Sequence, residues 1–180
     1  GDGRSNIYVT MGSTGLFETF MHRVYPALGE MPFRFLVTHG GQLSEATIAA
    51  APENFRFATY ASGSVLLRHC VAQVFHGGNT SLYQALAAGV PMVALPSHLE
   101  QAVGFRCAER FGFGLRLAPR RVTGPVLRQA IERVVHEPAF RRNAHRFSDA
   151  VRESKGPQNA ARLLEAHAAS GLPAGAGLQA

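Results

Sequence analysis

The sequence contains no tryptophan and only two cysteines, Cys70 and Cys107, in 180 residues. Two isolated cysteines in a chain of this length exclude a disulfide-stapled secreted scaffold and a cysteine-based metal site. Both lie in apolar segments with helical character, so we expect two buried thiols. No run approaches the roughly 18 apolar residues that a membrane span requires, and no signal peptide is recognisable. The sequence therefore predicts a cytoplasmic protein without a membrane span.

Lysine is also nearly absent, since Lys155 is the only one among 18 basic residues. The formal net charge is +6. The arginines are scattered, and no basic run is interleaved with aromatic side chains, so the composition does not favour nucleic-acid binding. A positive surface steers anionic ligands such as diphosphates toward a protein, although a solvated arginine-rich surface is the simpler interpretation.

What the chain does have is a regular alternation of apolar and amphipathic segments. Links between the segments are short, and such alternation predicts an α/β fold, a Rossmann-like parallel sheet of about six strands with helices on both faces. The predicted strands are 7–11, 33–37, 55–59, 71–75, 92–95 and 114–117. The predicted helices are 16–29, 63–69, 80–88 and 99–111, with a weaker segment at 42–50.

The last third of the chain is predicted to be helical, with helices at 124–136, 138–154 and 158–169. Thr123 suits the N-cap of the first, and Gly156-Pro157 separates the last two. We expect one domain over residues 1–169 and a disordered tail at 170–180, where Gly, Ala and Pro dominate. The chain does not begin with Met, and we expect it to be a piece of a longer protein.

The densest functional signal follows the strand at 71–75. His76 and two glycines come next, and a helix then begins near Asn79, Thr80 and Ser81. Glycines let the backbone approach a phosphate, and the first turn of a helix offers unpaired N–H groups and the positive end of its dipole. This pattern predicts an anion-binding site.

Two more loops reach the same edge of the predicted sheet. The loop after the first strand contains Gly12 and Ser13, and the loop after the fifth strand carries Glu100 and Gln101. Ligands of parallel sheets bind beyond the carboxyl ends of the strands. A loop suited to phosphate beside a loop suited to hydroxyl groups predicts a nucleotide-sugar site.

These residues resemble the C-terminal donor-binding domain of inverting glycosyltransferases with the GT-B fold, the family of antibiotic, macrolide and plant secondary-metabolite glycosyltransferases. The matching residues are His76, Gly78, Ser81, the run Ala-Leu-Ala-Ala-Gly-Val-Pro at 85–91, Pro96, Glu100 and Gln101. The match is dense over residues 76–101, and its looser framework covers nearly all of the chain.

The resemblance implies a role for each matching residue. The donor diphosphate would contact His76, Gly78, Asn79, Thr80 and Ser81, with Ser13 near the β-phosphate. The base and ribose would lie against Tyr60, Ala61, Ser62 and Gln84. Hydroxyl groups of the sugar would bind Glu100 and Gln101.

Gln84 departs from the family pattern, which has a ribose-binding glutamate at this place. A carboxylate accepts from both ribose hydroxyls, whereas an amide offers one acceptor oxygen and a donor. The amide suits a donor without a 2′-hydroxyl and favours a dTDP-sugar. UDP stays open, because the Pro or Trp that many relatives have beside the base is missing near Ser62. Ser81 and Gln84 also match a capping box, so contact with ribose and capping of the helix both stay open for Gln84.

The other site residues also have simpler structural interpretations. His76 is compatible with a core histidine at a strand end, Ser13 with a plain turn, and Glu100 and Gln101 with a solvated helix start. The remaining histidines show no metal-ligand spacing, and there is no acidic metal motif. We therefore expect neither a metal nor another cofactor.

The sequence thus predicts the donor-binding domain of an inverting glycosyltransferase that moves a hexose or deoxyhexose from a dTDP- or UDP-sugar to a small natural product. By the resemblance, the acceptor pocket and the general base belong to an N-terminal domain that this chain lacks. We expect no catalytic base here, and we expect the chain alone to bind nucleotide but transfer little or no sugar.

Three alternatives stay open for the function. The chain could be a separate donor-binding subunit, a non-catalytic auxiliary protein that pairs with another glycosyltransferase chain, or part of an epimerase or a different GT-B enzyme. A homodimer is also open.

Overall fold

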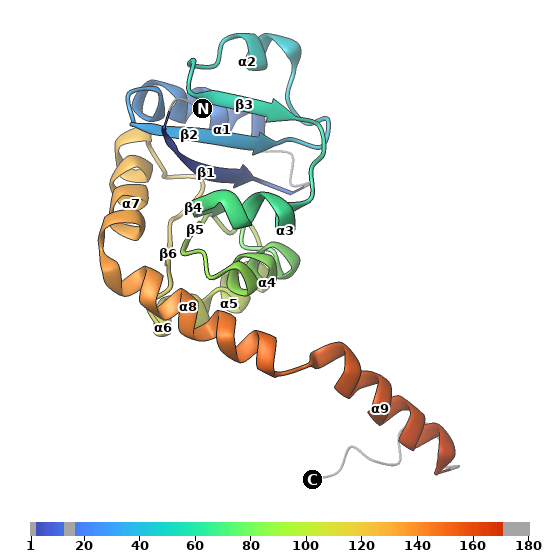
Figure 1. Cartoon of the computed structure of the whole chain (residues 1–180). Helices are drawn as coiled ribbons and strands as arrows, with labels where there is room; N and C mark the ends of the chain where they lie inside the picture. The colour runs from blue at the N-terminus through green and yellow to red at the C-terminus, as the bar shows by residue number, and fades with distance from the viewer. Residues whose placement is uncertain (1–2, 13–16, 171–180) are drawn as a thin grey trace.

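The computed structural model describes residues 3–12 and 17–170. Six parallel strands form one sheet in the order β3-β2-β1-β4-β5-β6 (Figure 1). The strands are β1 (Ser5–Thr10), β2 (Phe33–Thr38), β3 (Phe55–Ala58), β4 (Cys70–Phe75), β5 (Met92–Ala94) and β6 (Gly114–Arg116). The predicted α/β fold class is confirmed, and each strand lies within one or two residues of its predicted place.

Helices fill most of the connections between strands. They are α1 (Phe17–Gly29), α2 (Glu45–Ala49), α3 (Gly63–Leu66) continued by the 3-10 turn η1 (Leu67–His69), α4 (Asn79–Ala88), α5 (Leu99–Gly104), α6 (Arg106–Arg110), α7 (Gly124–His136), α8 (Pro138–Glu153) and α9 (Gly156–Ala169). Among the described residues, no helix has the length and apolar character needed to cross a membrane.

The chain starts in the middle of the sheet and builds outward in both directions. β1 pairs with β2 on one side and with β4 on the other. The connections on the two sides of β1 therefore leave in opposite directions, which opens a crevice beyond the carboxyl ends of β1 and β4. The Gly12 and His76 loops follow these two strands and so lie at that crevice.

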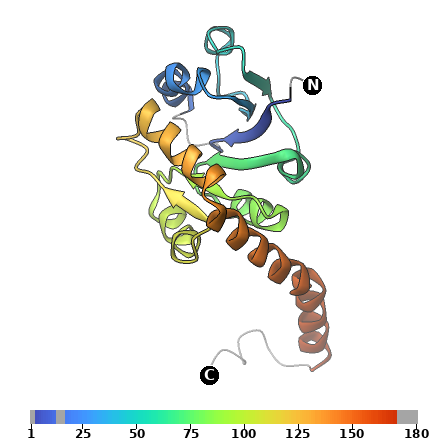
Figure 2. The ribbon, with the colours of Figure 1, turned by 60° about the vertical axis from the view of Figure 1, so that its left-hand side comes forward.

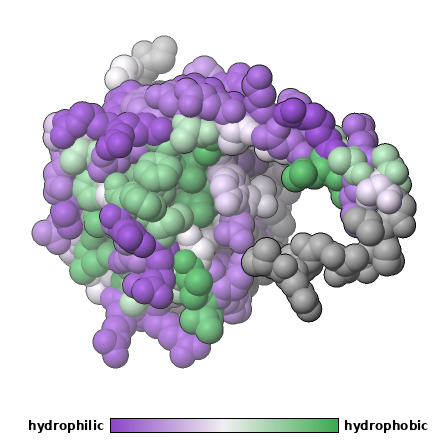
Figure 3. Space-filling view, turned by 90° about the horizontal axis from the view of Figure 1, so that it is seen from below, coloured by the Kyte–Doolittle hydropathy of each residue, from purple (hydrophilic) through white to green (hydrophobic). Residues whose placement is uncertain are grey.

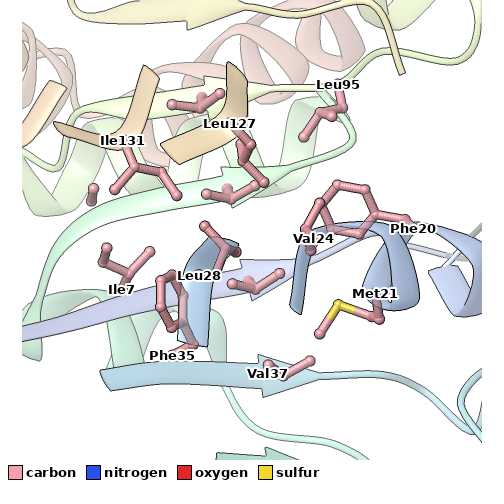
Figure 4. Packing of buried hydrophobic residues seen from close by; sticks show 14 of the residues in the cluster. Ile7, Phe20, Met21, Val24, Leu28, Phe35, Val37, Leu95, Leu127 and Ile131 are labelled. Atoms are coloured by element: carbon pink, nitrogen blue, oxygen red, sulfur yellow. The ribbon is translucent and has the colours of Figure 1, made fainter. Parts of the chain in front are cut away.

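Helices cover both faces of the sheet, as predicted. Along β1, Ile7 and Val9 point to the face covered by α1 and α7, while Tyr8 points to the other face, where α4, α6 and α8 pack. Figure 4 shows Leu28 of α1 and Ile131 of α7 on the same side of the sheet as Ile7. This alternation follows from the two-residue period of a strand.

One predicted helix was wrong, and two others begin one or two residues before their predicted starts. The segment 99–111 forms two helices, because Gly104, a weak helix former, ends α5 and the chain turns there to bury Phe105. Helix α9 begins at Gly156 after Lys155 adopts a left-handed φ of 46°, and Pro157 then occupies the first turn, where its missing N–H costs nothing. Helix α4 begins at Asn79, so Ser81 lies inside the first turn.

The environments of both cysteines were also predicted wrongly. Cys70 is the first residue of β4 and is half-buried, and burial raises the pKa of its thiol to about 12. Cys107 lies on the outer side of α6 and is exposed. Apolar flanking residues indicated burial in both cases, but Cys70 packs only at the margin of the core and Cys107 does not reach it.

Helix α9 stands apart from the rest of the domain. α7, α8 and α9 follow one another, and α9 extends away from the sheet (Figure 2); in Figure 3 an open gap separates α9 from the body. None of its residues is buried against the described part of the chain, and Leu163 and Leu164 are 72% and 71% exposed. The predicted disordered tail begins at Ser170, and residues 171–180 lie outside the described residues.

One polar side chain lies in the core without partners. Gln73, in the middle of β4, is fully buried, and neither its Oε1 nor its Nε2 meets a hydrogen-bond partner among the described residues. Asn54 is also buried, but its Nδ2 donates to the carbonyls of Leu28 at 2.9 Å, Met31 at 3.3 Å and Phe33 at 3.1 Å. A buried amide without partners destabilises the fold, whereas a bonded one supports it.

We expect Gln73→Met to raise the free energy of unfolding by about 1–3 kcal/mol, because the desolvation cost of two unpaired amide atoms is removed at nearly constant volume. Denaturant unfolding measures this change. Asn54→Leu is the contrasting variant and should lower stability, since three carbonyls lose their donor. A loss of stability in both variants would show that Gln73 is hydrogen-bonded in solution.

Helices α1 and α2 are joined through a carboxylate. Glu18 accepts hydrogen bonds from Ser44 N at 3.0 Å, from Ser44 Oγ at 2.5 Å and from Thr47 Oγ1. These bonds lower the pKa of Glu18 to about 2. Ser44 is the N-cap of α2, so the carboxylate fixes the start of that helix against α1.

This network predicts a pH dependence of stability. The depressed pKa means that Glu18 stabilises the fold above its ordinary pKa of 4.5 and loses this effect as the pH falls toward 2. We expect Glu18→Gln to unfold more easily than the wild type at pH 7 and to converge with it at low pH. A stability difference that does not change between pH 7 and pH 2 would contradict this assignment.

Candidate functional site

His76 occupies a narrow slot between two glycines. A Cβ atom on Gly12 would lie 2.7 Å from His76 Nε2, and a Cβ on Gly78 would lie 2.4 Å from the same nitrogen. Neither position therefore accepts a side chain while the ring stays in place. The loops after β1 and β4 approach each other closely because both have glycine where the ring passes.

The backbone of these loops also depends on glycine. Gly12 has a φ of 62° and Gly77 a φ of 87°, in the left-handed region where glycine is tolerated without strain. Gly78 has an ordinary φ of −67°. Position 12 thus requires glycine both for its backbone conformation and for the space that the His76 ring occupies. Position 78 requires glycine for that space alone.

The two ring nitrogens of His76 have different surroundings. Nδ1 is buried and meets no hydrogen-bond partner in the described structure, although the Thr10 backbone is close enough to raise the pKa slightly. Burial dominates and lowers the pKa of His76; His98 acts in the same direction and Glu100 in the opposite one. The neutral imidazole is therefore the main form at pH 7, and Nε2 is the nitrogen that faces the two glycines.

Helix α4 begins directly after this slot. Gly78 is its N-cap and has no side chain to bond the first turn, so the N–H groups of Asn79, Thr80 and Ser81 have no partner within the helix. Those N–H groups and the positive end of the helix dipole lie next to His76. Together they form an arrangement suited to an anion.

Glu100 and Gln101 lie beside the start of α4. Asn79 Nδ2 donates to Glu100 Oε1 at 3.0 Å. This bond joins a residue predicted to bind the diphosphate to a residue predicted to bind the sugar. Glu100 is exposed and free to bind on its outer side. Gln101 is buried, and its Oε1 accepts from Ser97 N at 3.0 Å and from Ser97 Oγ at 3.3 Å. The side-chain carbonyl of Gln101 thus holds the loop that precedes α5.

A pocket of about 420 Å³ opens on the other side of α4. It extends from the loop after β2, across the ends of β1 and β3, to the first two turns of α4. Tyr8 Oη and Thr38 Oγ1, 2.7 Å apart, form a hydrogen-bonded pair in its wall, and Tyr60, which is 85% exposed, stands at its rim. The lining residues are Tyr8, Thr10, Gly12, Thr38, His39, Gly40, Gln42, Thr59, Tyr60, Ala61, Gly63, Thr80 and Gln84.

The structure gathers most of the predicted site residues in two adjoining places. Of the predicted base and ribose residues, Tyr60, Ala61 and Gln84 line the pocket, and Thr80 joins them from α4. Ser62 does not line it and instead bonds Ser64 Oγ at 2.9 Å. His76, Gly78, Asn79 and Glu100 cluster at the start of α4. Ser13 lies outside the described residues.

The structure excludes one of the two interpretations of Gln84. Because α4 begins at Asn79, Gln84 lies in the second turn, too far along the helix to bond the N-cap, and the capping box is wrong. Its Oε1 points at Gly63, where a Cβ would come within 2.5 Å. The Gln84 amide faces the pocket and lies against Gly63, where a side chain would clash with it.

Sequence reasoning missed six polar residues of the pocket, namely Tyr8, Thr10, Thr38, His39, Gln42 and Thr59. Thr38 and His39 end β2 at the same sheet edge as the other loops, so their place in the chain was a usable signal. Tyr8 gave none, because an aromatic residue inside a strand is typical of a core. Within the described residues, no group of three or more His, Cys, Asp or Glu side chains is placed to hold a metal.

Comparison with known proteins gives the class of this architecture. The domain superimposes on the calicheamicin glycosyltransferase CalG4 with a TM-score of 0.82 at 25% identity, covering 94% of this chain and 43% of that one. It superimposes equally well, at 22% identity, on the glycotransferase of kitacinnamycin, covering 90% of this chain and 42% of that one. The fold is that of a GT-B glycosyltransferase domain.

Sequence comparison narrows the class to a family. Residues 24–167 match the family described as erythromycin biosynthesis protein CIII-like, C-terminal domain, and the chain belongs to it. The resemblance to antibiotic and macrolide glycosyltransferases is thereby confirmed.

Two curated relatives show how much of a full-length protein the chain represents. The 3-alpha-mycarosylerythronolide B desosaminyl transferase of Saccharopolyspora erythraea is 28% identical over 92% of this chain and 40% of its own length. The demethyllactenocin mycarosyltransferase of Streptomyces fradiae is 29% identical over 91% of this chain and 36% of its own length. The chain thus spans about two-fifths of these relatives.

The His76 slot predicts a specific energetic coupling. Gly78→Ala should destabilise the domain because the new Cβ meets the ring, and His76→Ala should remove most of that cost, with a coupling energy of about 1–3 kcal/mol. Gly12→Ala should keep a residual cost in the His76→Ala background, since its positive φ stays unfavourable for alanine. Double-mutant cycles of unfolding free energy test both statements. Additive effects of Gly78→Ala and His76→Ala would contradict the slot.

Proposed function

We propose that this chain is the donor-binding domain of an inverting glycosyltransferase and that it binds a nucleoside diphosphate sugar. The observation that carries the proposal is the His76 slot beside the uncapped start of α4, with a nucleoside-sized pocket on one side and Glu100 on the other. Nucleoside, diphosphate and sugar are joined in this order in such a donor. The site offers matching chemistry in the same order.

The domain would assist the reaction through the leaving group. When an acceptor hydroxyl displaces the nucleoside diphosphate from the anomeric carbon, negative charge grows on the diphosphate. Fixed N–H donors of α4 and the Nε2–H of a neutral His76 stabilise that charge without reorganising. Since a phosphate close to Nε2 favours the imidazolium, donor binding would raise the pKa of His76.

We propose a dTDP-sugar as the preferred donor, with a UDP-sugar as the alternative. The support is Gln84, an amide on the pocket wall where a carboxylate would bind both ribose hydroxyls. The related desosaminyl and mycarosyl transferases support a deoxyhexose as the sugar and a natural product as the acceptor.

The acceptor and the general base would come from the part of the enzyme that this chain does not include. About three-fifths of the length of the desosaminyl transferase lies outside the match. The apolar Leu163 and Leu164 on α9 are exposed in the described part of the chain, and we propose that α9 packs on that other part of the enzyme. The isolated chain should then bind donor nucleotide and transfer little or no sugar.

Isothermal titration with dTDP, UDP and GDP tests the proposal. We expect dTDP to bind more tightly than UDP, and His76→Ala to weaken dTDP by roughly 10- to 100-fold, the effect of losing one hydrogen bond to a charged group. Gln84→Glu should shift the preference toward UDP by roughly 5-fold, because a second ribose hydroxyl gains an acceptor.

His167→Ala, on the exposed face of α9, is the matched control and should leave every affinity unchanged. A preference for UDP in the wild type would keep the donor-binding role and refute the deoxyribose argument. Absence of binding to all three nucleotides by a folded chain would favour an auxiliary protein over a donor-binding domain.

A further inference from the structure

Gly12 is held from a second side by a residue that the family resemblance does not single out. Gln42, in the loop after β2, donates from Nε2 to the Gly12 carbonyl, 30 residues away in the sequence. The same nitrogen lies 3.3 Å from the carbonyl of His39. One amide therefore bridges the loop after β1 and the loop after β2.

The loop that carries Gln42 is itself well anchored. Its backbone bonds the end of β3, through His39 N to Ala58 O at 3.2 Å and Gly40 N to Thr59 O at 2.8 Å. A further bond from Gln42 N to His39 O at 2.9 Å closes the turn. Gly40 and Gly41 adopt positive φ values of 57° and 81°, which lets the chain reverse within these four residues. The amide of Gln42 thus reaches Gly12 from a rigid base.

The two contacts on Gly12 act on different atoms. The His76 ring limits the space at its Cα, and Gln42 fixes the direction of its carbonyl. A left-handed glycine has much conformational freedom, so a single contact would not define the course of the chain beyond it. With both contacts in place, the peptide that leads out of β1 has one orientation.

We infer that Gln42 is a positioning residue, which holds the loop after β1 against His76 and so couples the nucleoside pocket to the diphosphate site. Gln42 also lines the pocket beside Thr38 and His39, and an occupied pocket therefore sits against the residue that sets the geometry of the anion site. A nucleoside diphosphate engages both places at once, whereas a nucleoside monophosphate has one phosphate fewer to gain from the coupling.

The identity of the ligand in this inference rests on the proposed function. A second measurement tests the positioning role of Gln42 without any ligand. Gln42→Met keeps the length of the side chain and removes the donor. Release of the Gly12 carbonyl should loosen the slot, expose His76 to solvent and move its pKa up toward the usual value of about 6.5. Long-range proton–nitrogen NMR of the imidazole in the isolated chain measures that pKa.

The binding arm compares dTDP with dTMP by isothermal titration. We expect Gln42→Met to weaken dTDP about tenfold and dTMP much less, so that the ratio of their affinities falls, as expected from loss of a hydrogen bond that organises the diphosphate site. Gln129→Met, the same substitution on α7, is the matched control and should change neither the ratio nor the pKa of His76.

Asn54→Ala separates positioning from general loss of stability. It removes three buried hydrogen bonds at the far ends of β2 and β3, and it should lower stability while leaving the pKa of His76 unchanged. An unchanged pKa in folded Gln42→Met would overturn the positioning role. A wild type that binds neither nucleotide would refute the proposed function instead, and the pKa measurement would still decide the role of Gln42.

Discussion

The close approach of two loops around the ring of His76 is the constraint on which the rest of the site depends. The ring fits only because Gly12 and Gly78 leave room for it, and the clash distances of 2.7 and 2.4 Å show how little room there is. This packing sets how closely the loops after β1 and β4 approach each other, at the point where the sheet order reverses. It also buries Nδ1, and this burial lowers the pKa of His76 and favours the neutral imidazole. A buried orphan nitrogen costs stability, and such costs are tolerated where a site needs a defined geometry.

The sheet edge that carries the candidate site combines groups that each bind an anion weakly and that are held in fixed positions. Each unpaired N–H at the start of α4, each glycine turn and each amide is ordinary by itself. Under the proposed function, rigid placement would make them effective toward the charge that grows on the diphosphate, because no free energy would be spent on orienting them during the reaction. Gln42 extends this principle to a third loop, since its amide holds the Gly12 carbonyl from a turn that is anchored on β3.

Membership in the erythromycin CIII-like family fits the proposed role of this chain as the donor-binding side of an active site. The chain spans about two-fifths of its curated relatives. No residue of α9 is buried in the described fold, and under the proposal this helix packs on another part of the enzyme. Gln84 is where this sequence differs chemically from the family pattern, and its amide faces the pocket.

Sequence patterns were enough to predict the strands, their alternation with helices, and the gathering of the Gly12, His76 and Glu100 loops at one edge of the sheet. Each of these depends on local periodicity or on the chemistry of adjacent residues, which a single chain displays directly. The tertiary structure was needed to show that α4 begins at Asn79, that Gln101 bonds Ser97, that Cys107 is exposed, and that Tyr8 and Gln42 reach the pocket. The contacts of Tyr8 with Thr38 and of Gln42 with Gly12 join residues 30 positions apart, and such contacts exist only once β1 and β2 lie side by side.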